Sequence, residues 1–331
     1  VGVLVQRGEQ LAAVSGDQRV IVTQQFEHLQ QGLVRQAFAV AAVADEQLEQ
    51  RVQRRVVLLA GQLLDCQLID RFVVLRILRQ ARLQFGDIRQ IGGLAEELDL
   101  PMHCHLHETA SEVSDAVSRS GERPFDRFER LGLINERLMA IHGVHLNHQE
   151  LQTMATKGAT LVHCPASNLK LASGIAPVAA ALKAGVNVVI GTDGAASNNK
   201  LDLWEEGRLA SLLCKGASGD ATAFPAGQLL MSMTCNAAKA LGAEHLIGRI
   251  TPGLQADLIA VAVGEAAHQL PNHNLISKLA YSGASRDVRH VWVAGVQVVQ
   301  SQQLVGQRAQ LVGEIMRKTQ RVWQTRVEKV G

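Results

Sequence analysis

The chain contains 331 residues, of which 47% are hydrophobic and 19% are charged, so it can bury a large core and is not a disordered protein. Its 33 basic and 31 acidic residues leave a formal net charge of +2, which favours neither nucleic acid nor an anionic membrane as a partner, and no apolar run is long enough to span a bilayer. The five cysteines form no CxxC pair, which argues against a disulfide framework or a zinc ribbon and favours a reduced, cytoplasmic protein.

The segment 1–86 differs in composition from the rest of the chain. Proline, lysine, asparagine, tryptophan, tyrosine and methionine are absent before position 100, whereas glutamine, arginine, valine and leucine are abundant. Short apolar runs at 20–22, 56–60 and 72–78 predict a few strands or helices, and no catalytic motif accompanies them. We therefore treat 1–86 as a separate segment.

Two interpretations of this segment stay open. It is either a Gln-rich helical domain or a stretch translated from the wrong frame or strand. Antisense reading of CTG codons gives CAG, which enriches leucine and glutamine and depletes lysine and asparagine. The valine at position 1 fits either a fragment or a GTG start. The DNA sequence across codons 80–100 would decide between them.

Residues 87–250 have the pattern of an α/β protein. Amphipathic helices are predicted at 88–98, 147–158 and 175–185, the last two closed by glycines at their ends. Strands are predicted at 101–107, 139–146, 159–168 (running into a loop) and 186–194. Strands separated by helices at this spacing indicate successive βα units of a parallel sheet or barrel.

The pattern changes again over residues 251–331. A turn and a strand are predicted over 251–263, followed by a hairpin that turns at Ala294–Gly295. An amphipathic helix is predicted over 304–323. We expect a small β element with a closing helix and no catalytic cluster.

Histidines are concentrated where the predicted strands lie, with seven of the twelve between positions 103 and 163. His103, His105 and His107 alternate along one strand, which predicts that all three project from one face. Further polar candidates stand at the ends of the four strands: Glu108, His142, His163 and Asp193. Barrel enzymes place their catalytic groups at such ends, and imidazoles with a carboxylate suit Zn²⁺.

Four motifs carry a resemblance to a known family. In order along the chain they are PMHCHLHETASEV, AIHGVHLN, VHCPASNLKLASGIAPV and GTDGAASNNKLDLWEEGRLA. Over residues 87–331 the chain resembles the amidohydrolase superfamily, and most closely the 5-methylthioadenosine/S-adenosylhomocysteine deaminases with their guanine-deaminase and triazine-hydrolase relatives. The resemblance implies an α/β fold, a (β/α)₈ TIM-like barrel with a small β domain, of which the first half would be aberrant or incomplete in this chain.

The resemblance also implies an activity and a set of roles. The expected reaction is metal-dependent hydrolytic deamination of adenosine-like thioether nucleosides, with release of ammonia. His105 and Asp193 would bind one Zn²⁺ per subunit, with Fe²⁺ as an alternative. Glu108 would shuttle a proton, His142 would orient the hydroxide, and Asp193 would take a proton from the water. Glu108 and Asp193 would also contact the substrate.

Other polar residues are given structural roles. We expect His103, His107, His145 and His148 to pack or to lie on loops, and the resemblance assigns no ligand role to His163. Asn168 and Lys170 are expected to shape the loop after the third strand. The expected partner is a purine nucleoside, and a homo-oligomer remains open because dimers are common.

One departure from the family pattern limits these expectations. The family's first strand carries an HxH pair with two metal ligands, and His28 is the only histidine here before His103. Catalytic zinc normally has three protein ligands and a water, so His105 and Asp193 alone are too few. The sequence therefore predicts weak metal binding and negligible turnover for this chain. Two alternatives stay open: an aminohydrolase acting on guanine, a pterin or a triazine, and an inactive half-barrel.

Overall fold

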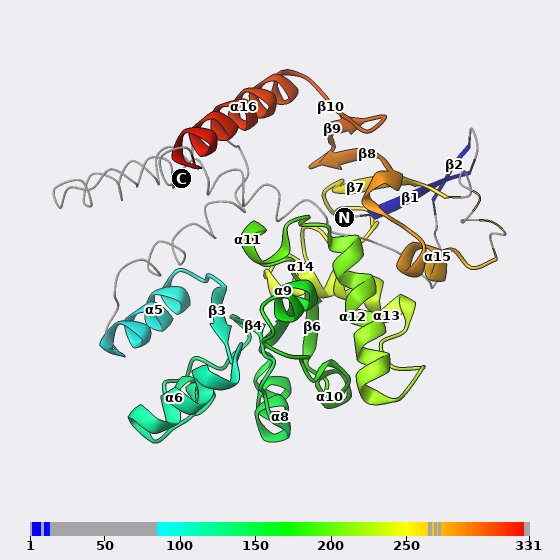
Figure 1. Ribbon diagram of the computed structural model, residues 1–331. Helices are drawn as coiled ribbons and strands as arrows, with labels where there is room; N and C mark the ends of the chain where they lie inside the picture. Colours follow the sequence, from blue (N-terminus) through cyan, green and yellow to red (C-terminus); the bar gives the residue numbers. More distant parts are fainter. Residues whose placement is uncertain are drawn as a thin grey trace.

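The computed structural model describes residues 2–7, 10–13, 85–263, 267, 270 and 273–327 (Figure 1). The apolar runs at 20–22, 56–60 and 72–78 lie outside the described residues. Within the described part of the chain, no helix is both long enough and apolar enough to cross a bilayer.

A four-stranded parallel sheet forms the centre of the fold, as the alternation of strands and helices predicts. Its strands pair in chain order and are β3 (Met102–Leu106), β4 (Leu138–His142), β5 (Thr160–His163) and β6 (Asn187–Ile190). Parallel pairing sets their carboxyl ends along one edge, with Leu106 opposite His142 and His163 opposite Ile190. The sheet thereby brings the predicted strand-end residues close together.

Helices alternate with these strands. They are α5 (Phe85–Glu97), α6 (Ala110–Ser120), α7 (Pro124–Arg130), α8 (His148–Lys157), α9 (Pro165–Lys170), α10 (Val178–Ala184), α11 (Ala195–Asn198), α12 (Leu203–Ser218), α13 (Ala226–Ser232) and α14 (Cys235–Ala240). Gly158 and Gly185 end α8 and α10 in the left-handed conformation, as predicted. The predicted loop after β5 is wrong, because Pro165 starts the short helix α9 there.

The parallel sheet is buried on both faces. Leu138, Ala140, Leu161 and Val188 belong to the larger hydrophobic cluster, together with residues of α8 and α10. Their neighbours along the strands point the other way and form a smaller cluster, which Ala240 of α14 joins: Met139, Ile141, Val162 and Val189. Near-continuous apolar strands are what a sheet covered on both sides requires.

A second sheet stands beside the first (Figure 1). Its strand order is β10-β9-β8-β7-β1-β2. The strands are β1 (Gly2–Arg7), β2 (Gln10–Ala13), β7 (Leu258–Ala262), β8 (Val288–Val293), β9 (Val296–Gln300) and β10 (Gln303–Leu304). The helix α15 (Leu275–Tyr281) and the 3₁₀ turn η2 (Ser285–Asp287) lie between β7 and β8, and α16 (Gln307–Val327) follows β10.

The predicted hairpin is confirmed in this second sheet. Ala294 and Gly295 have φ of 49° and 81°, and positive φ at both positions is what a two-residue hairpin turn requires. The parallel pairing of β1 with β7 is not predicted by the sequence. Strands from the segment 1–86 therefore take part in the same sheet as strands from residues 251–331.

Candidate metal centre

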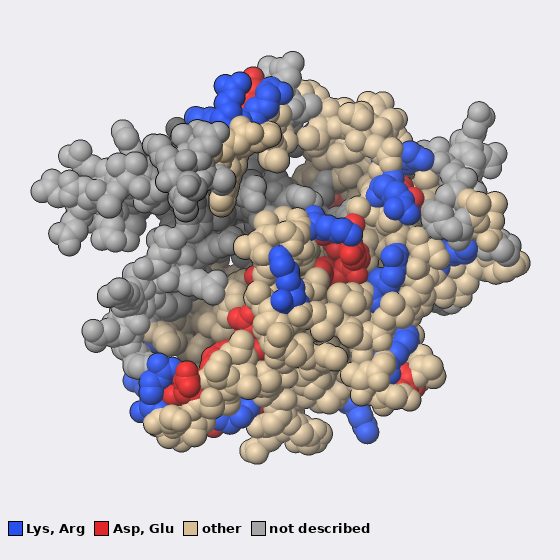
Figure 2. Space-filling view, in the orientation of Figure 1, with Lys and Arg blue, Asp and Glu red and all other residues tan. Residues whose placement is uncertain are grey.

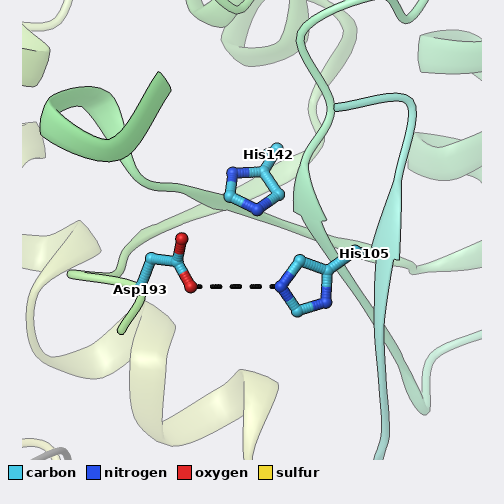
Figure 3. Close-up of side chains that lie close together, drawn as sticks. All are labelled: His105, His142 and Asp193. Atoms are coloured by element: carbon cyan, nitrogen blue, oxygen red, sulfur yellow. Dashed lines mark ion pairs between the residues drawn. The ribbon is translucent and has the colours of Figure 1, made fainter. Parts of the chain in front are cut away.

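Three polar side chains meet at the carboxyl edge of the parallel sheet (Figure 3). His105 lies near the end of β3, His142 ends β4, and Asp193 follows β6. Each offers one ligand atom, and these atoms all lie within 4.8 Å of one another. His105 Nε2 is 3.9 Å from Asp193 Oδ1. The expected meeting of His105 and Asp193 is therefore observed, with His142 as a third member.

The backbone is strained where two of these residues leave their strands. His142 has φ of 73° and Asp193 has φ of 58°. A residue with a Cβ atom pays a conformational cost in this left-handed region, and such residues tend to occur at functional sites. The strain is offset by the contacts that hold each side chain.

Two serines fix the Asp193 carboxylate. The hydroxyls of Ser167 in α9 and Ser197 in α11 both donate hydrogen bonds to Oδ2, each at 2.7 Å. Burial opposes ionisation, but the facing His105 imidazole, the two hydroxyls and the Gly194 amide hold the pKa of Asp193 well below its usual range. Asp193 is therefore an anion at neutral pH, with Oδ1 turned toward His105.

The His142 ring is fully buried, and its two nitrogens have different surroundings. Nδ1 lies 2.8 Å from Oδ1 of the buried Asn168. Nε2 has no hydrogen-bond partner among the described residues, and it lies 3.7 Å from Oε2 of Glu108. A buried polar atom without a partner is costly and calls for an explanation at the site.

Glu108 is held at the rim of this site through its backbone. Oε2 of Glu112 accepts a hydrogen bond from the Glu108 amide at 2.7 Å, and Oε1 accepts one from the His107 amide at 3.0 Å. Thr109 caps α6 by accepting a hydrogen bond from the Glu112 amide. The helix start thus fixes the turn that carries Glu108.

The prediction that His103, His105 and His107 share a face is wrong for His107. The rings of His103 and His105 remain neighbours, with centroids 6.4 Å apart. The strand ends at Leu106, however, and a φ of 54° at His107 redirects its side chain into the core. There its Nε2 accepts a hydrogen bond from the Phe125 amide at 3.2 Å.

The remaining histidines near the site fill structural positions, as expected. His163 at the end of β5 is buried and is not part of the three-residue cluster. Burial first, and then the neighbouring His142, lowers its pKa to about 4, so it is neutral at pH 7. His145 Nε2 lies 3.0 Å from the Ser173 carbonyl oxygen, and His148 is exposed beside Gln152 on α8.

A buried carboxylate that sequence reasoning missed ties the serine-bearing helices together. Glu206 of α12 is only 2% exposed. Its Oε2 accepts a hydrogen bond from the Ala166 amide at 3.0 Å, and its Oε1 accepts one from Asn198 Nδ2 at 2.7 Å. Ser167 directly follows Ala166, and Ser197 directly precedes Asn198. Its partners lie in the motifs PASN and GAASNN, which the sequence analysis identified. The spacing of these motifs along the chain does not predict that Glu206 contacts both.

On the face that Figure 2 shows, basic and acidic side chains of the described residues lie in small scattered groups among uncharged ones. One adjacent pair is Lys200 with Glu205, at 2.7 Å. This mixture agrees with the small net charge of +2. The site's own negative charge comes from Asp193 and the nearby Glu108, which suits a cation.

The donor set fits a divalent transition metal. Two imidazole nitrogens and one carboxylate oxygen are common zinc ligands, whereas Mg²⁺ and Ca²⁺ prefer sites made of oxygen atoms alone. The unpartnered Nε2 of the buried His142 supports the same conclusion, because a metal ion would satisfy it.

Comparison with known proteins gives a consistent result. The family model described as the amidohydrolase family matches residues 10–298. Two proteins named 5-methylthioadenosine/S-adenosylhomocysteine deaminase match well. The one from Teredinibacter turnerae is 42% identical over 217 residues, covering 66% of this chain and 49% of the relative. The one from Moorella thermoacetica is 45% identical over 208 residues, covering 63% and 48%.

Solved structures show the same relation. The crystal structure of an adenosine deaminase from Xanthomonas campestris with bound zinc has a TM-score of 0.70 and 42% identity, covering 73% of this chain and 55% of that one. A triazine hydrolase variant has a TM-score of 0.63 and 26% identity, covering 68% and 50%. The neighbours imply a TIM-barrel-like α/β fold. The chain spans about half the length of the curated relatives it matches.

Proposed function

The chain belongs to the amidohydrolase family, and from this premise we propose that it is a metal-dependent hydrolytic deaminase of adenosine-like thioether nucleosides. The carrying observation is the convergence of His105, His142 and Asp193 within 4.8 Å at the carboxyl edge of a parallel sheet. The names of the two curated relatives and the zinc in the Xanthomonas campestris structure support the substrate class and the metal.

In this proposal His105 Nε2 and Asp193 Oδ1 hold a single Zn²⁺. Zinc, when bound, supplies the positive charge that makes water nucleophilic near neutral pH. The anionic Asp193 also receives a proton from the attacking water, since its low pKa keeps the carboxylate deprotonated before the reaction. The serine hydroxyls on Oδ2 keep Oδ1 facing His105, where the ion would be held.

Glu108 is the second residue that transfers a proton in this proposal. Its carboxylate stands at the site, 3.7 Å from His142 Nε2, and the Glu112 contacts fix its backbone. A carboxyl group placed there passes one proton of the water to a ring nitrogen of the purine, and the proton taken up by Asp193 goes to the departing amine. Water and the aminopurine are thereby converted to the oxo-purine and ammonia. In the role that the resemblance implies, the unpartnered Nε2 of His142 orients the water.

The proposal is tested with the full chain, reconstituted with zinc and assayed for ammonia release. The proposal predicts release from 5-methylthioadenosine and S-adenosylhomocysteine, and less from guanine and a triazine, whereas the missing HxH pair predicts negligible turnover. Preference for the triazine would instead favour the activity that the name of the triazine hydrolase neighbour suggests. Asp193→Asn is the matched negative control, since it removes the anionic ligand while keeping its size.

The alternative is an inactive chain, which the lack of an HxH pair before His103 favours. It predicts no ammonia from any of these substrates, whether or not zinc is bound. Measuring zinc content alongside ammonia separates the cases. Bound zinc with deamination supports the enzyme, and a lack of deamination, with or without bound zinc, supports the alternative.

A further inference from the structure

The last helix of the chain, α16, leaves large apolar side chains open to solvent. Figure 1 shows α16 at the top of the molecule, away from the parallel sheet. Within residues 311–324 every residue is exposed except Gly313, which is half-buried. Six of the exposed residues are large and apolar, with 37–64% of their surface exposed: Leu311, Val312, Ile315, Met316, Val322 and Trp323. Single exposed apolar residues are ordinary, whereas a group of this size marks an interaction site.

These six residues share one side of the helix. At 3.6 residues per turn they fall within an arc of about 140°, and Thr319 lies near the middle of that arc. We call the six residues and Thr319 the apolar face of α16. Polar residues occupy the rest of the circumference over 311–324: Glu314, Arg317, Lys318, Gln320, Arg321 and Gln324.

The spacing of the apolar face is symmetric about position 317. Three pairs of positions are equidistant from it: Leu311 with Trp323, Val312 with Val322, and Ile315 with Thr319. A two-fold axis brings residue i of one copy against residue j of the other and the reverse, so it requires such self-complementary spacing. The remaining residue, Met316, would then lie opposite Lys318, whose methylene groups can cover it while the ammonium stays in water.

The area of the apolar face is large enough for a dimer. A large side chain presents roughly 150–250 Å² when fully exposed, so the exposed fractions amount to roughly 500–700 Å² in each chain. Two such faces in contact would bury about 1,000–1,400 Å², which reaches the range of about 1,200–2,000 Å² for specific, stable interfaces.

A lipid surface is the rival occupant, because α16 contains five basic residues and one acidic residue. A lipid surface has no register, however, and would not select a spacing that is symmetric about one position. A second copy of the same helix does require this symmetry. The spacing and the area therefore favour a second copy.

We propose that the apolar face of α16 binds the same face of a second copy of this chain, with the two helices antiparallel about a two-fold axis near position 317. This interface does not depend on the proposed function, because the three clustered residues of the metal centre lie on other elements. It gives the expected homo-oligomer a defined surface.

The oligomeric state of the full chain is measured by sedimentation equilibrium. Wild type is expected to be a dimer with a dissociation constant in the micromolar range or below, as interfaces of this size give. Val312→Glu and Val322→Lys each put a charge into the apolar face and should raise the dissociation constant at least about 30-fold. Gln324→Glu puts a charge on the opposite side of the helix and should dimerise like wild type.

Both substitutions in one chain test the antiparallel arrangement. Positions 312 and 322 lie about 15 Å apart along one helix, so the two introduced charges cannot pair within a chain. Across the two-fold axis the introduced carboxylate of one copy meets the introduced ammonium of the other. The Val312→Glu, Val322→Lys double variant should therefore dimerise to within about 10-fold of wild type. A parallel pair would bring like charges together, so a double variant no better than the single ones overturns the antiparallel arrangement.

The remaining outcomes also decide the question. A monomeric wild type overturns the proposal, as does a dimer that neither single variant weakens. Flotation with vesicles of phosphatidylserine and phosphatidylcholine tests the rival, and a monomeric chain that floats with them would identify a lipid-binding helix instead. Circular dichroism melts check that each variant is folded. If a single variant does not fold, Leu311→Cys and Trp323→Cys chains are mixed and oxidised, and a mixed disulfide absent from wild type and from either chain alone supports the interface, whereas its absence overturns it.

Discussion

Glu108 is proposed to transfer protons in this site without binding the metal. Its Oε2 lies 3.7 Å from His142 Nε2, but Glu108 is not part of the cluster formed by His105, His142 and Asp193. Glu112, one helical turn further on, accepts hydrogen bonds from the amides of His107 and Glu108, so the two acids have separate roles. A change at Glu108 should therefore act on proton transfer and leave metal binding alone.

We expect Glu108→Gln to lower the rate of ammonia release from a zinc-loaded chain by at least about 100-fold, because the amide cannot shuttle a proton. Zinc content should stay equal to that of wild type. The measurements are the initial rate and the metal content of the same sample. Glu136→Gln, at an exposed position, is the control with unchanged rate. A full rate in Glu108→Gln would remove this residue from the mechanism.

His107 shows how a residue beside the site takes on a structural role instead. Its Nδ1 lies 3.6 Å from Oε2 of the buried Glu150, and Arg123 Nε donates to Glu150 Oε1 at 2.6 Å. Burial alone would raise the pKa of Glu150, but His107, Arg123 and the Asn147 amide lower it to about 2. The carboxylate stabilises the folded state whenever it is ionised.

The pH dependence follows from that lowered pKa. The stabilisation by Glu150 is complete above the ordinary pKa of 4.5 and is lost as the pH falls toward about 2. We expect Glu150→Gln to lower the free energy of unfolding by about 2–4 kcal/mol at pH 7, because it leaves Arg123 without its partner. The difference from wild type should shrink between pH 4.5 and 2 in urea titrations. Glu129→Gln, an exposed position on α7, should match wild type throughout.

At the scale of elements, α9 and α11 depend on one side chain of α12. Glu206 accepts one hydrogen bond from each short helix, and those helices carry the serines that hold Asp193. Helices as short as six and four residues are marginal on their own and take their stability from such contacts. Glu206 therefore helps to set the position of Asp193, although it does not contact Asp193 in the hydrogen bonds described here.

We expect Glu206→Gln to destabilise the chain by about 1–3 kcal/mol, because an amide can accept at only one of the two positions. Amide hydrogen exchange should become faster in α9 and α11. The matched control is the neighbouring Glu205→Gln, whose exposed pair with Lys200 contributes little to stability. Equal exchange rates in the two variants would show that Glu206 does not hold these helices.

Sequence patterns predict the elements better than the contacts between them. Alternation and helical spacing place the strands β3 to β6 correctly, and strand-end positions identify His105, His142 and Asp193. The redirected side chain of His107 escapes prediction because its φ is decided by contacts with Phe125 and Glu150, 18 and 43 residues away in sequence. The serines on Asp193 escape for the same reason, since Ser167 lies 26 residues from it.

For the whole molecule, metal binding and stability should be linked. The three clustered side chains lie in or just after three strands of one sheet, so an ion that bound all of them would favour the folded chain. Binding at 100 times the dissociation constant adds about 2.7 kcal/mol. For a protein of this size that corresponds to a rise in melting temperature of about 4 °C.

We expect this rise on adding zinc to the metal-free chain in a calorimetric or fluorescence melt, and its reversal by a chelator. Asp193→Asn should show a much smaller rise. An equal rise in Asp193→Asn would place the bound zinc elsewhere in the molecule. The division of the chain at residues 86 and 250 stays a prediction, as does assembly into a homo-oligomer.

The pairing of β1 with β7 has a consequence for how the chain matures on the ribosome. The parallel sheet joins strands that follow one another closely, from Met102 to Ile190, and can assemble while synthesis continues. β1, however, must wait until Leu258–Ala262 has emerged from the exit tunnel. At about 5–20 residues per second, the delay is on the order of ten seconds or more. Throughout that interval the edge of β1 that later pairs with β7 is open, and an open strand edge is a site of aggregation.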